Sequence, residues 1–591
     1  MKKTLLGLVS ISAFLLSGCF FDSGFEENYE EKDIAIYREK DKVDKKISLR
    51  FFESSPNVPY IAVNDFFKEF FNMEYRLIRE GNNYIYYSIY GGYLRFESDF
   101  CLVSIQNPTV FNYHPDTISN RAKTYDKAAS IETTPNYEKT IRLSNYYILV
   151  HSDGNEAYLP LSFLSSLAGG LSGYNVAYNG KDIYVLDYNA SLTNEVRDPA
   201  YYGSDKFYEV ILDKNSERPY DLASNNYWQL CFVFDNLRGY TSQLVFGDNN
   251  LLTIGLDGIL STYYPKIKEY LLSKDKNEYM IGFTSLMFGL SDGGHTGATC
   301  KSLVSPYYNT IKNDSDLSDL YQKGYSSLFN KSVVKVAYQT ARKKVFSDIQ
   351  SNELGFYYKK DDVTKTAYIG FDSFTVDYRG WEDFYNNKTN ETPINTDTYA
   401  FVLDKFYQAQ NDGMKNIVFD LTSNGGGNTG AVMGLVGLLN EGKADFIYNN
   451  TVSMFRSTEH HLIDINLDGK WDDKDVLEAK KFDFNIGVLT SEYSFSAANL
   501  FPSLLKEFGY KIIGSQSGGG SCAVSRAVTS DGLDYVHSSY LCLGNKTGEN
   551  IDSGVPVDYF IDYHDDEGYY YPLSYFDCNI TGNYLSNAYN I

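Results

Sequence analysis

The chain has 591 residues, more than a single hydrophobic core usually serves, so we expect two or three domains. Hydrophobic residues make up 43% of it, which is enough to fill such cores and excludes an intrinsically disordered protein. The formal net charge is −23, and because an acidic surface of that size repels phosphate backbones, nucleic acid is not expected as a partner.

The first 19 residues predict an export signal. Two lysines follow the initiator methionine, an apolar stretch runs from Leu5 to Leu16, and small residues lead to Cys19. The stretch is too short for an ordinary transmembrane helix. The order Leu16-Ser17-Gly18-Cys19 resembles the bacterial lipobox, which implies a lipidated Cys19 that anchors the exported protein to a membrane of the bacterial cell envelope. Simple cleavage beside a chance cysteine is the alternative.

Residues 20–46 are dense in charge and poor in apolar periodicity, so we interpret them as a tether between the anchor and the folded body. No later apolar run is long enough to span a bilayer, which places the rest of the chain outside the membrane.

The remaining cysteines are sparse and irregularly spaced. They include no CxxC pair, which argues against a zinc cluster, while export permits disulfides. Their pairing stays open, with Cys522 to Cys542 as one option among Cys101, Cys231, Cys300, Cys522, Cys542 and Cys578.

Residues 47–190 predict a β-rich domain of short strands with small helices between them. Two segments look alike, 58–71 and 157–188. In the second, glycines stop a helix and a hairpin follows, in which Asn179-Gly180 favours a type I′ turn. The pattern resembles the copper amine oxidase N-terminal-like domain, which implies a binding or spacer module, and nothing in it suggests copper.

From residue 205 to about residue 300 the pattern changes to helices. Apolar residues recur at spacings of three and four, which predicts helices within 227–240, 258–273 and 278–290. The polar stretch 305–323 predicts a surface excursion.

After residue 365, strands alternate with helices. This alternation predicts an α/β fold with a mainly parallel sheet, in which ligands bind beyond the carboxyl ends of the strands. We expect strands over 366–374, 415–421, 484–490 and 510–514, and helices over 398–413, 429–442 and 497–509.

The loop Asp420–Gly427 lies at one of these carboxyl ends, where a buried strand runs into three glycines and then a helix. Glycines let backbone N–H groups point into a cavity at a helix N-terminus, which suits an anion or an oxyanion. A tight turn without a ligand is the alternative. A P-loop is excluded, because no GK[ST] follows.

A second such loop holds Ser491, Ser494 and Ser496, between a strand that ends at Thr490 and a helix that starts near Ala497. A serine on a strand-to-helix turn can project its Oγ into solvent while the next N–H points the same way. Helix capping explains these serines as well, because serine is a favoured N-cap.

A serine needs a base to become a nucleophile, and histidine titrates in the right range. His295, in the turn 290–299, is the candidate, because none of the other six histidines has comparable turn residues around it. An ordinary loop histidine is the alternative.

Four motifs follow one another in the chain: DGGHTG, DLTSNGGG, SFSAAN and IIGSQSGGG. Their order over about residues 206–563 resembles the S41 family of serine peptidases, which includes the C-terminal processing peptidases and the tricorn core. The resemblance implies a ClpP/crotonase-like α/β core within a peptidase domain at 205–565. It also implies that Ser496 is the nucleophile, because Ser496 stands where the family has its S-A pair. The backbone N–H groups of Ala497, Gly426 and Gly425 would form the oxyanion hole.

Members of this family divide by their base. Processing peptidases use a lysine after an IIGE segment, but 514–524 has glycines and serines there and Lys511 lies before it. The resemblance therefore implies His295 as the base, as in tricorn-like members, with an extra glycine in its turn. A carboxylate must hold the imidazole tautomer. Asp552 falls nearest to the family's position, and Glu549 is the alternative.

Residues 464–475 have oxygen donors at positions 1, 3, 5, 9 and 12 and a glycine at position 6, which is the EF-hand spacing. An aspartate at position 12 looks more like the dockerin variant. An acidic, solvated loop is the alternative. The pattern predicts a structural Ca²⁺ site within an insertion at about 455–480, with ligands from Asp464, Asn466, Asp468, the carbonyl of Lys470, Asp472 and Asp475.

The sequence as a whole predicts an exported, lipid-anchored serine endopeptidase that hydrolyses a protein or peptide substrate through an acyl-enzyme, without a cofactor for catalysis. The alternative is a cell-surface lipoprotein whose S41-like scaffold is catalytically degenerate and binds peptide or glycan.

Overall fold

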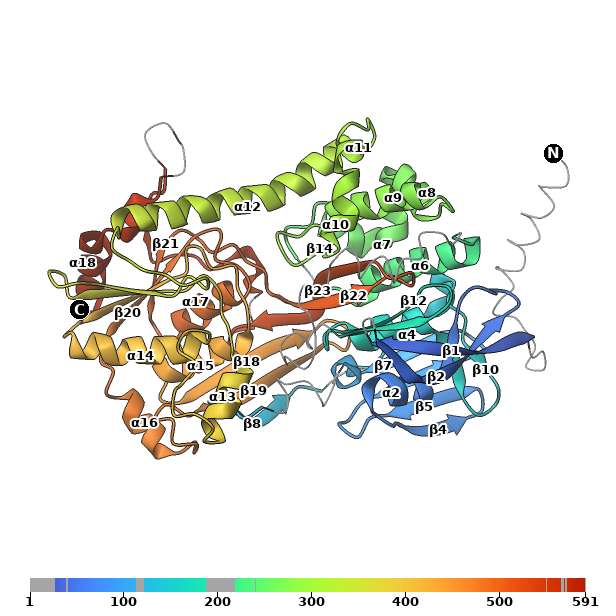
Figure 1. Ribbon diagram of the computed structural model, residues 1–591, viewed down its shortest axis with the longest axis horizontal. Helices are drawn as coiled ribbons and strands as arrows, with labels where there is room; N and C mark the ends of the chain where they lie inside the picture. Colours follow the sequence, from blue (N-terminus) through green and yellow to red (C-terminus); the bar gives the residue numbers. More distant parts are fainter. Residues whose placement is uncertain are drawn as a thin grey trace.

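The computed structural model describes residues 27–38, 41–112, 122–135, 137–187, 218–239, 241–548, 550–564, 568 and 571–589. The predicted export signal, with Cys19, and Glu549 lie outside these residues. Figure 1 shows a β-rich N-terminal part, a helical part and an α/β part that follow one another along the chain. None of the described helices combines the length and the apolar character needed to cross a bilayer.

The N-terminal part consists of two sheets with helices α2 (Val63–Phe71) and α4 (Leu161–Gly169). The larger sheet has the order β10 (His151–Ser152), β11 (Ala157–Pro160), β3 (Tyr60–Ala62), β2 (Asp41–Phe52), β1 (Tyr29–Arg38), β13 (Ile183–Asp187) and β12 (Tyr174–Tyr178). The smaller sheet is an antiparallel set of β4 (Arg76–Glu80), β5 (Asn83–Tyr87), β6 (Tyr93–Glu97), β7 (Leu102–Gln106) and β9 (Lys139–Arg142).

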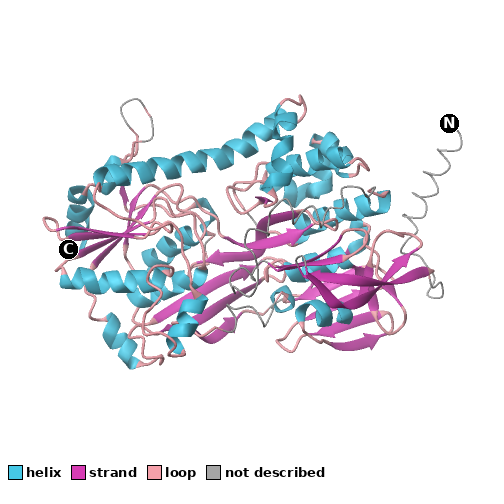
Figure 2. Ribbon diagram, in the orientation of Figure 1, coloured by secondary structure: helices cyan, strands magenta, loops and turns pink. Residues whose placement is uncertain are grey.

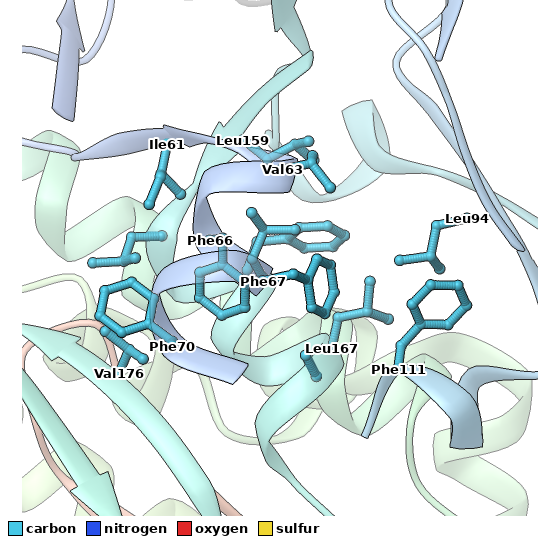
Figure 3. Close-up of a cluster of buried hydrophobic side chains, with 14 of the residues drawn as sticks. Ile61, Val63, Phe66, Phe67, Phe70, Leu94, Phe111, Leu159, Leu167 and Val176 are labelled. Atoms are coloured by element: carbon cyan, nitrogen blue, oxygen red, sulfur yellow. The ribbon is translucent and has the colours of Figure 1, made fainter. Parts of the chain in front are cut away.

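An aromatic core fills the space around these two helices. Phe66, Phe67 and Phe70 of α2 belong to one buried cluster with Leu167 of α4 and Leu94 of the smaller sheet (Figure 3). The two look-alike segments place their strands side by side, because β3 and β11 pair antiparallel and each leads into one of the helices.

The interpretation of residues 20–46 as a tether is wrong for the part that is described. Residues 29–38 and 41–52 form the hairpin β1–β2, in the middle of the larger sheet. In β2, Ile47, Leu49 and Phe51 are buried while the charged residues between them are not. A strand buried on one face needs only every second residue to be apolar, so a high charge content does not exclude it.

The helical part contains α6 (Tyr220–Asn236), α7 (Asp248–Tyr263), α8 (Pro265–Leu271) and α9 (Lys276–Gly289). Helices α6 and α9 overlap the helices predicted within 227–240 and 278–290, whereas the single helix predicted within 258–273 is divided between the end of α7 and α8. The stretch 305–323, predicted as a surface excursion, is mostly exposed but helical: α11 (Tyr308–Lys312) and the start of α12 (Ser318–Val345) lie there, after the short α10 (Lys301–Val304). Ile311, Leu317 and Leu320 are buried in the helical core, and this packing forms helix from a polar sequence.

The α/β part confirms the alternation expected from the sequence. Its sheet has the order β15 (Tyr357–Asp361), β16 (Thr366–Gly370), β17 (Asn416–Asp420), β20 (Asn485–Thr490), β21 (Lys511–Gly514) and β24 (Tyr559–Phe560), and only the β15–β16 pair is antiparallel. Short α13 (Tyr378–Tyr385) follows β16. One face packs on α14 (Thr398–Asn411), α15 (Thr429–Leu439) and α17 (Ala497–Glu507). The other packs on α12 and α18 (Cys578–Tyr589).

A fourth sheet joins the three parts. Its order is β14 (Gly297–Ala298), β23 (Asp534–Gly544), β18 (Lys443–Asn450), β19 (Phe455–Ile463) and β8 (Asp126–Thr133), with β22 (Cys522–Val528) paired to β23. Figure 2 shows these strands running through the middle of the molecule. Because β8 comes from the N-terminal part and β14 from the histidine turn, the sheet ties both to the α/β part.

Candidate active site

Ser496 lies on the turn between β20 and α17, directly before the helix begins. Its backbone has φ 57° and ψ −119°, a conformation that residues other than glycine rarely adopt. Although Ser496 holds the N-cap position, its side chain makes no capping hydrogen bond. The strained strand-to-helix turn is the geometry that exposes a nucleophilic serine in other hydrolases.

The side chains of the other two serines form hydrogen bonds to the glycine loop. Ser491 Oγ donates to the carbonyl of Thr422 over 2.7 Å, and Ser494 Oγ donates to the carbonyl of Leu421 over 2.7 Å. Ser494 Oγ also accepts the N–H of Ser491 over 3.0 Å. Both therefore fasten the serine loop to the glycine loop, as the capping and turn interpretation expects.

The glycine loop packs directly against Ser496. A Cβ added at Gly426, whose φ is 110°, would lie 2.7 Å from the Cβ of Ser496, so a larger residue has no room there. The N–H of Gly426 is donated to Asn424 Oδ1 over 2.8 Å. Among the described residues, no hydrogen bond uses the N–H of Gly425 or of Ala497. These two N–H groups are therefore available to another acceptor, whereas that of Gly426 is used within the loop.

Asp292 holds the histidine turn in place. Its carboxylate accepts the N–H of His295 over 3.1 Å and that of Thr296 over 2.8 Å, and it accepts Ser538 Oγ of β23 over 2.7 Å. The sequence reasoning gave no part to Asp292. Through Ser538, Asp292 anchors the turn to β23 of the fourth sheet.

The ring of His295 lies against the turn that carries Ser496. Its centroid is 4.7 Å from that of Phe495, the residue before Ser496, and only 6% of His295 is exposed. Burial lowers the pKa of His295, the charges of Asp292 and Asp552 oppose this, and Lys331 adds to it. A lowered pKa favours the neutral imidazole, the form that can accept a proton.

Asp552 lies in the short 3₁₀ helix Ile551–Ser553 and is buried. One oxygen accepts the N–H and the Oγ of Ser242, over 2.6 and 2.7 Å, and the other accepts the N–H of Ser521 over 3.0 Å. Asp552 therefore acts on His295 through its charge, while its hydrogen bonds hold two neighbouring loops.

Lys331 of α12 is a site residue that the sequence reasoning missed. Its Nζ donates to the carbonyl of Gly293 in the histidine turn and lies 3.7 Å from the centroid of the Phe495 ring. Burial lowers the pKa of Lys331 to about 8. The sequence could have indicated this residue by its spacing. Lys331 lies three, seven and ten residues before Val334, Tyr338 and Ala341, which are all buried, so this spacing places Lys331 on the inner face of α12.

The predicted calcium loop follows β19 and leads into α16 (Asp473–Ala479). The backbone of the loop already uses its carboxylates: Asp464 accepts the N–H of Gly469 over 2.7 Å, and Asp475 accepts the N–H of Ile465 over 2.8 Å. In the described part of the chain, no three His, Cys, Asp or Glu side chains are grouped to hold a metal ion. The side chains as they lie do not fit a bound Ca²⁺, and calcium binding stays a prediction.

The model of peptidase family S41 matches residues 365–559, which include the glycine loop, Ser496 and Asp552. His295 and Lys331 precede the matched region. The match begins after the β-rich part, so the resemblance of that part to the copper amine oxidase N-terminal-like domain stays a prediction. No curated protein matches the chain.

The solved structures that resemble the chain do so weakly. A candidate peptidase from Parabacteroides merdae is 15% identical, with a TM-score of 0.38 over 60% of this chain and 92% of that one. The photosystem II D1 C-terminal processing protease is 19% identical, with a TM-score of 0.25 over 33% and 42%. A lipoprotein from Streptococcus agalactiae is 13% identical, with a TM-score of 0.29 over 55% and 87%.

All three TM-scores are below 0.5, so the assignment depends on the family model. That model covers the strand, glycine loop and nucleophile turn described above. Residues 365–559 of this chain are thus similar in sequence to peptidase family S41.

Proposed function

We propose that the protein is a serine peptidase in which Ser496 is the nucleophile and His295 is its base. The observation that carries the proposal is the difference in hydrogen bonding among the three serines of the loop. Ser491 and Ser494 are bound to carbonyls of the glycine loop, whereas Ser496 makes no capping bond and sits on a strained turn beside the histidine turn. An unfavourable backbone conformation is retained where it serves a function.

The chemistry follows from these placements. His295 removes the proton of Ser496 Oγ as it attacks the substrate carbonyl, and the N–H groups of Gly425 and Ala497 stabilise the oxyanion of the tetrahedral intermediate. The imidazolium then protonates the leaving amine, and an acyl-enzyme remains. Water, activated by His295 in the same way, hydrolyses the acyl-enzyme. Asp552, through its charge, favours the imidazolium that forms in each step.

The test is labelling with a fluorophosphonate, which reacts with activated serines, together with hydrolysis of an unfolded protein. We expect both in the wild type, neither in Ser496→Ala and little of either in His295→Ala. His564→Ala, which changes an exposed histidine, is the matched control and should behave like the wild type. Equal hydrolysis by Ser496→Ala and the wild type would exclude Ser496. A folded wild type that neither labels nor hydrolyses would instead favour a binding protein on a degenerate scaffold.

We also propose that the protein is exported and anchored by a lipid at Cys19, because the lipobox-like order ends at that cysteine. Expression of the full chain in a bacterium with a radiolabelled fatty acid tests this. Label in the wild type, its loss in Cys19→Ser and release of that variant from the membrane fraction are expected. A wild-type chain without label contradicts the lipid anchor but leaves the peptidase proposal untouched.

A further inference from the structure

A single aromatic ring, that of Phe495, is shared by three segments of the site. The ring of His295 packs on it with an interplanar angle of 62°. Lys331 Nζ lies 3.7 Å from its centroid, within the range of a cation–π interaction. Because Phe495 directly precedes Ser496, this ring connects the base, the nucleophile and helix α12.

The glycines of the histidine turn are fitted to this arrangement. A Cβ at Gly293 would lie 3.2 Å from Lys331 Nζ, and a Cβ at Gly294 would lie 3.1 Å from Cε1 of Phe495. Lys331 also donates a hydrogen bond to the carbonyl of Gly293. The extra glycine of this turn thus lets the chain pass closely between a lysine and a phenylalanine.

The charges that act on His295 come from three elements. Asp292 of its own turn and Asp552 of the 3₁₀ helix stabilise the imidazolium, whereas Lys331 of α12 destabilises it. The same two carboxylates act on Lys331 and favour its charged form. Lys331 is the cation that opposes them at the base.

We propose that Lys331 is a positioning residue of this peptidase, which clamps the histidine turn against the nucleophile turn and keeps a positive charge beside His295 so that the imidazole stays neutral. The proposal rests on the proposed function, because it concerns the same base. Lys331 itself does not touch the reacting atoms. It acts through Gly293, Phe495 and the charge that His295 feels.

The sign of the expected change follows from this placement. A neighbouring cation disfavours the imidazolium, so removing it in Lys331→Met raises the pKa of His295. A base must be neutral to accept a proton, so the acid limb of the pH profile of kcat/KM should move to higher pH, by about 0.5 unit or more. Lys331→Arg keeps the charge and should leave the acid limb in place, even if its different shape lowers kcat.

Lys335→Met is the matched control. Lys335 lies one turn further along α12, with its Nζ 5.5 Å from the centroid of the Tyr493 ring, and it is not among the charges that act on His295. The acid limb of the pH profile of kcat/KM should be the same in Lys335→Met as in the wild type. A purely structural role for Lys331 would lower activity in Lys331→Met at every pH without moving the limb.

Direct titration of His295 by NMR, in protein that also carries Ser496→Ala, gives a second measurement that needs no hydrolysis. We expect a higher imidazole pKa in the Lys331→Met background than in the Lys331→Arg or Lys335→Met background. Equal values overturn the inference about Lys331, whatever the activity. Absent hydrolysis in the wild type combined with a raised pKa in Lys331→Met would contradict the proposed function and leave the electrostatic role of Lys331 standing.

Discussion

At the scale of single residues, the hydrogen bonds of three serines decide the interpretation of one loop. Ser494 lies two positions before Ser496, yet its Oγ is buried and makes two hydrogen bonds, while Ser496 is half-buried on a turn that no cap requires. Two nearby serines therefore have different roles, and substituting each of them should affect different properties of the protein.

Ser494→Ala should lower stability and spare chemistry, whereas Ser496→Ala should do the reverse. The first change leaves the carbonyl of Leu421 and the N–H of Ser491 without their buried partner, at a cost of about 1–3 kcal/mol. Thermal unfolding of both variants, with fluorophosphonate labelling of the folded protein, measures this. A Ser494→Ala variant with wild-type stability, or with no labelling although folded, would contradict the division.

The sequence predicts the nucleophile turn and the glycine loop well, because short motifs there describe local backbone geometry. It does not predict which backbone N–H groups are free to bind an oxyanion. Asn424, inside the motif, accepts a hydrogen bond from the N–H of Gly426, and the motif itself does not indicate this bond. Lys331 is missed for a different reason. Its contacts with Gly293 and Phe495 join segments far apart in the chain, and no local pattern reports them.

At the scale of elements, strands and helices with clear periodicity are predicted to within a few residues, as α14, α15 and β20 show. Two elements that mix charged and buried residues are not, namely the hairpin β1–β2 and helix α12. In both, tertiary packing decides the structure.

Strands β22 and β23 place Cys522 directly opposite Cys542, with their Sγ atoms 3.4 Å apart. We expect oxidised glutathione to join them: one thiolate displaces glutathione to form a mixed disulfide, and the second cysteine displaces the other glutathione. The product should be about 2 Da lighter and should melt at a higher temperature than reduced protein. Cys522→Ser should abolish both effects, and Cys101→Ser is the control. Unchanged mass after oxidation would contradict the pairing.

The loop before α16 allows a test of the calcium prediction. If Ca²⁺ displaces backbone N–H groups from the carboxylates, millimolar CaCl₂ should raise the melting temperature relative to EDTA, because a ligand that binds only the folded state stabilises it. Asp468→Ala should remove this increase. Equal melting temperatures in CaCl₂ and EDTA would show that this is an acidic loop without a metal.

At the scale of the whole molecule, the fourth sheet links the N-terminal and α/β parts, because β8 pairs with β19. At the β8–β19 junction, His461 Nδ1 lies 2.7 Å from Asp126 Oδ1. Although burial of the ring opposes it, hydrogen bonds with Asp126 and Glu459 raise the pKa of His461 to about 9. A raised pKa stabilises the folded state fully below about pH 6.5, the unfolded value, and this stabilisation is lost as the pH rises towards 9.

Asp126→Asn should therefore destabilise the protein by about 2 kcal/mol at pH 6 and by much less at pH 10, where His461 is neutral in both proteins. Urea unfolding at the two pH values measures the difference. Asp445→Asn, next to the less buried His460, is the matched control and should have a smaller effect. Equal destabilisation by Asp126→Asn at both pH values would mean that the ion pair does not contribute.

The pairing of β8 with β19 also sets an order of events during synthesis. Thr133 leaves the ribosome more than 300 residues before Ser457, its partner in the sheet. Until then β8 lacks β19, the strand with which it pairs in the folded protein. Tyr125, beside β8, likewise has to wait for the synthesis of Tyr399 before the two rings can stack. Distant pairings form slowly and leave strand edges open to aggregation. The chain can therefore become fully native only after synthesis of β19.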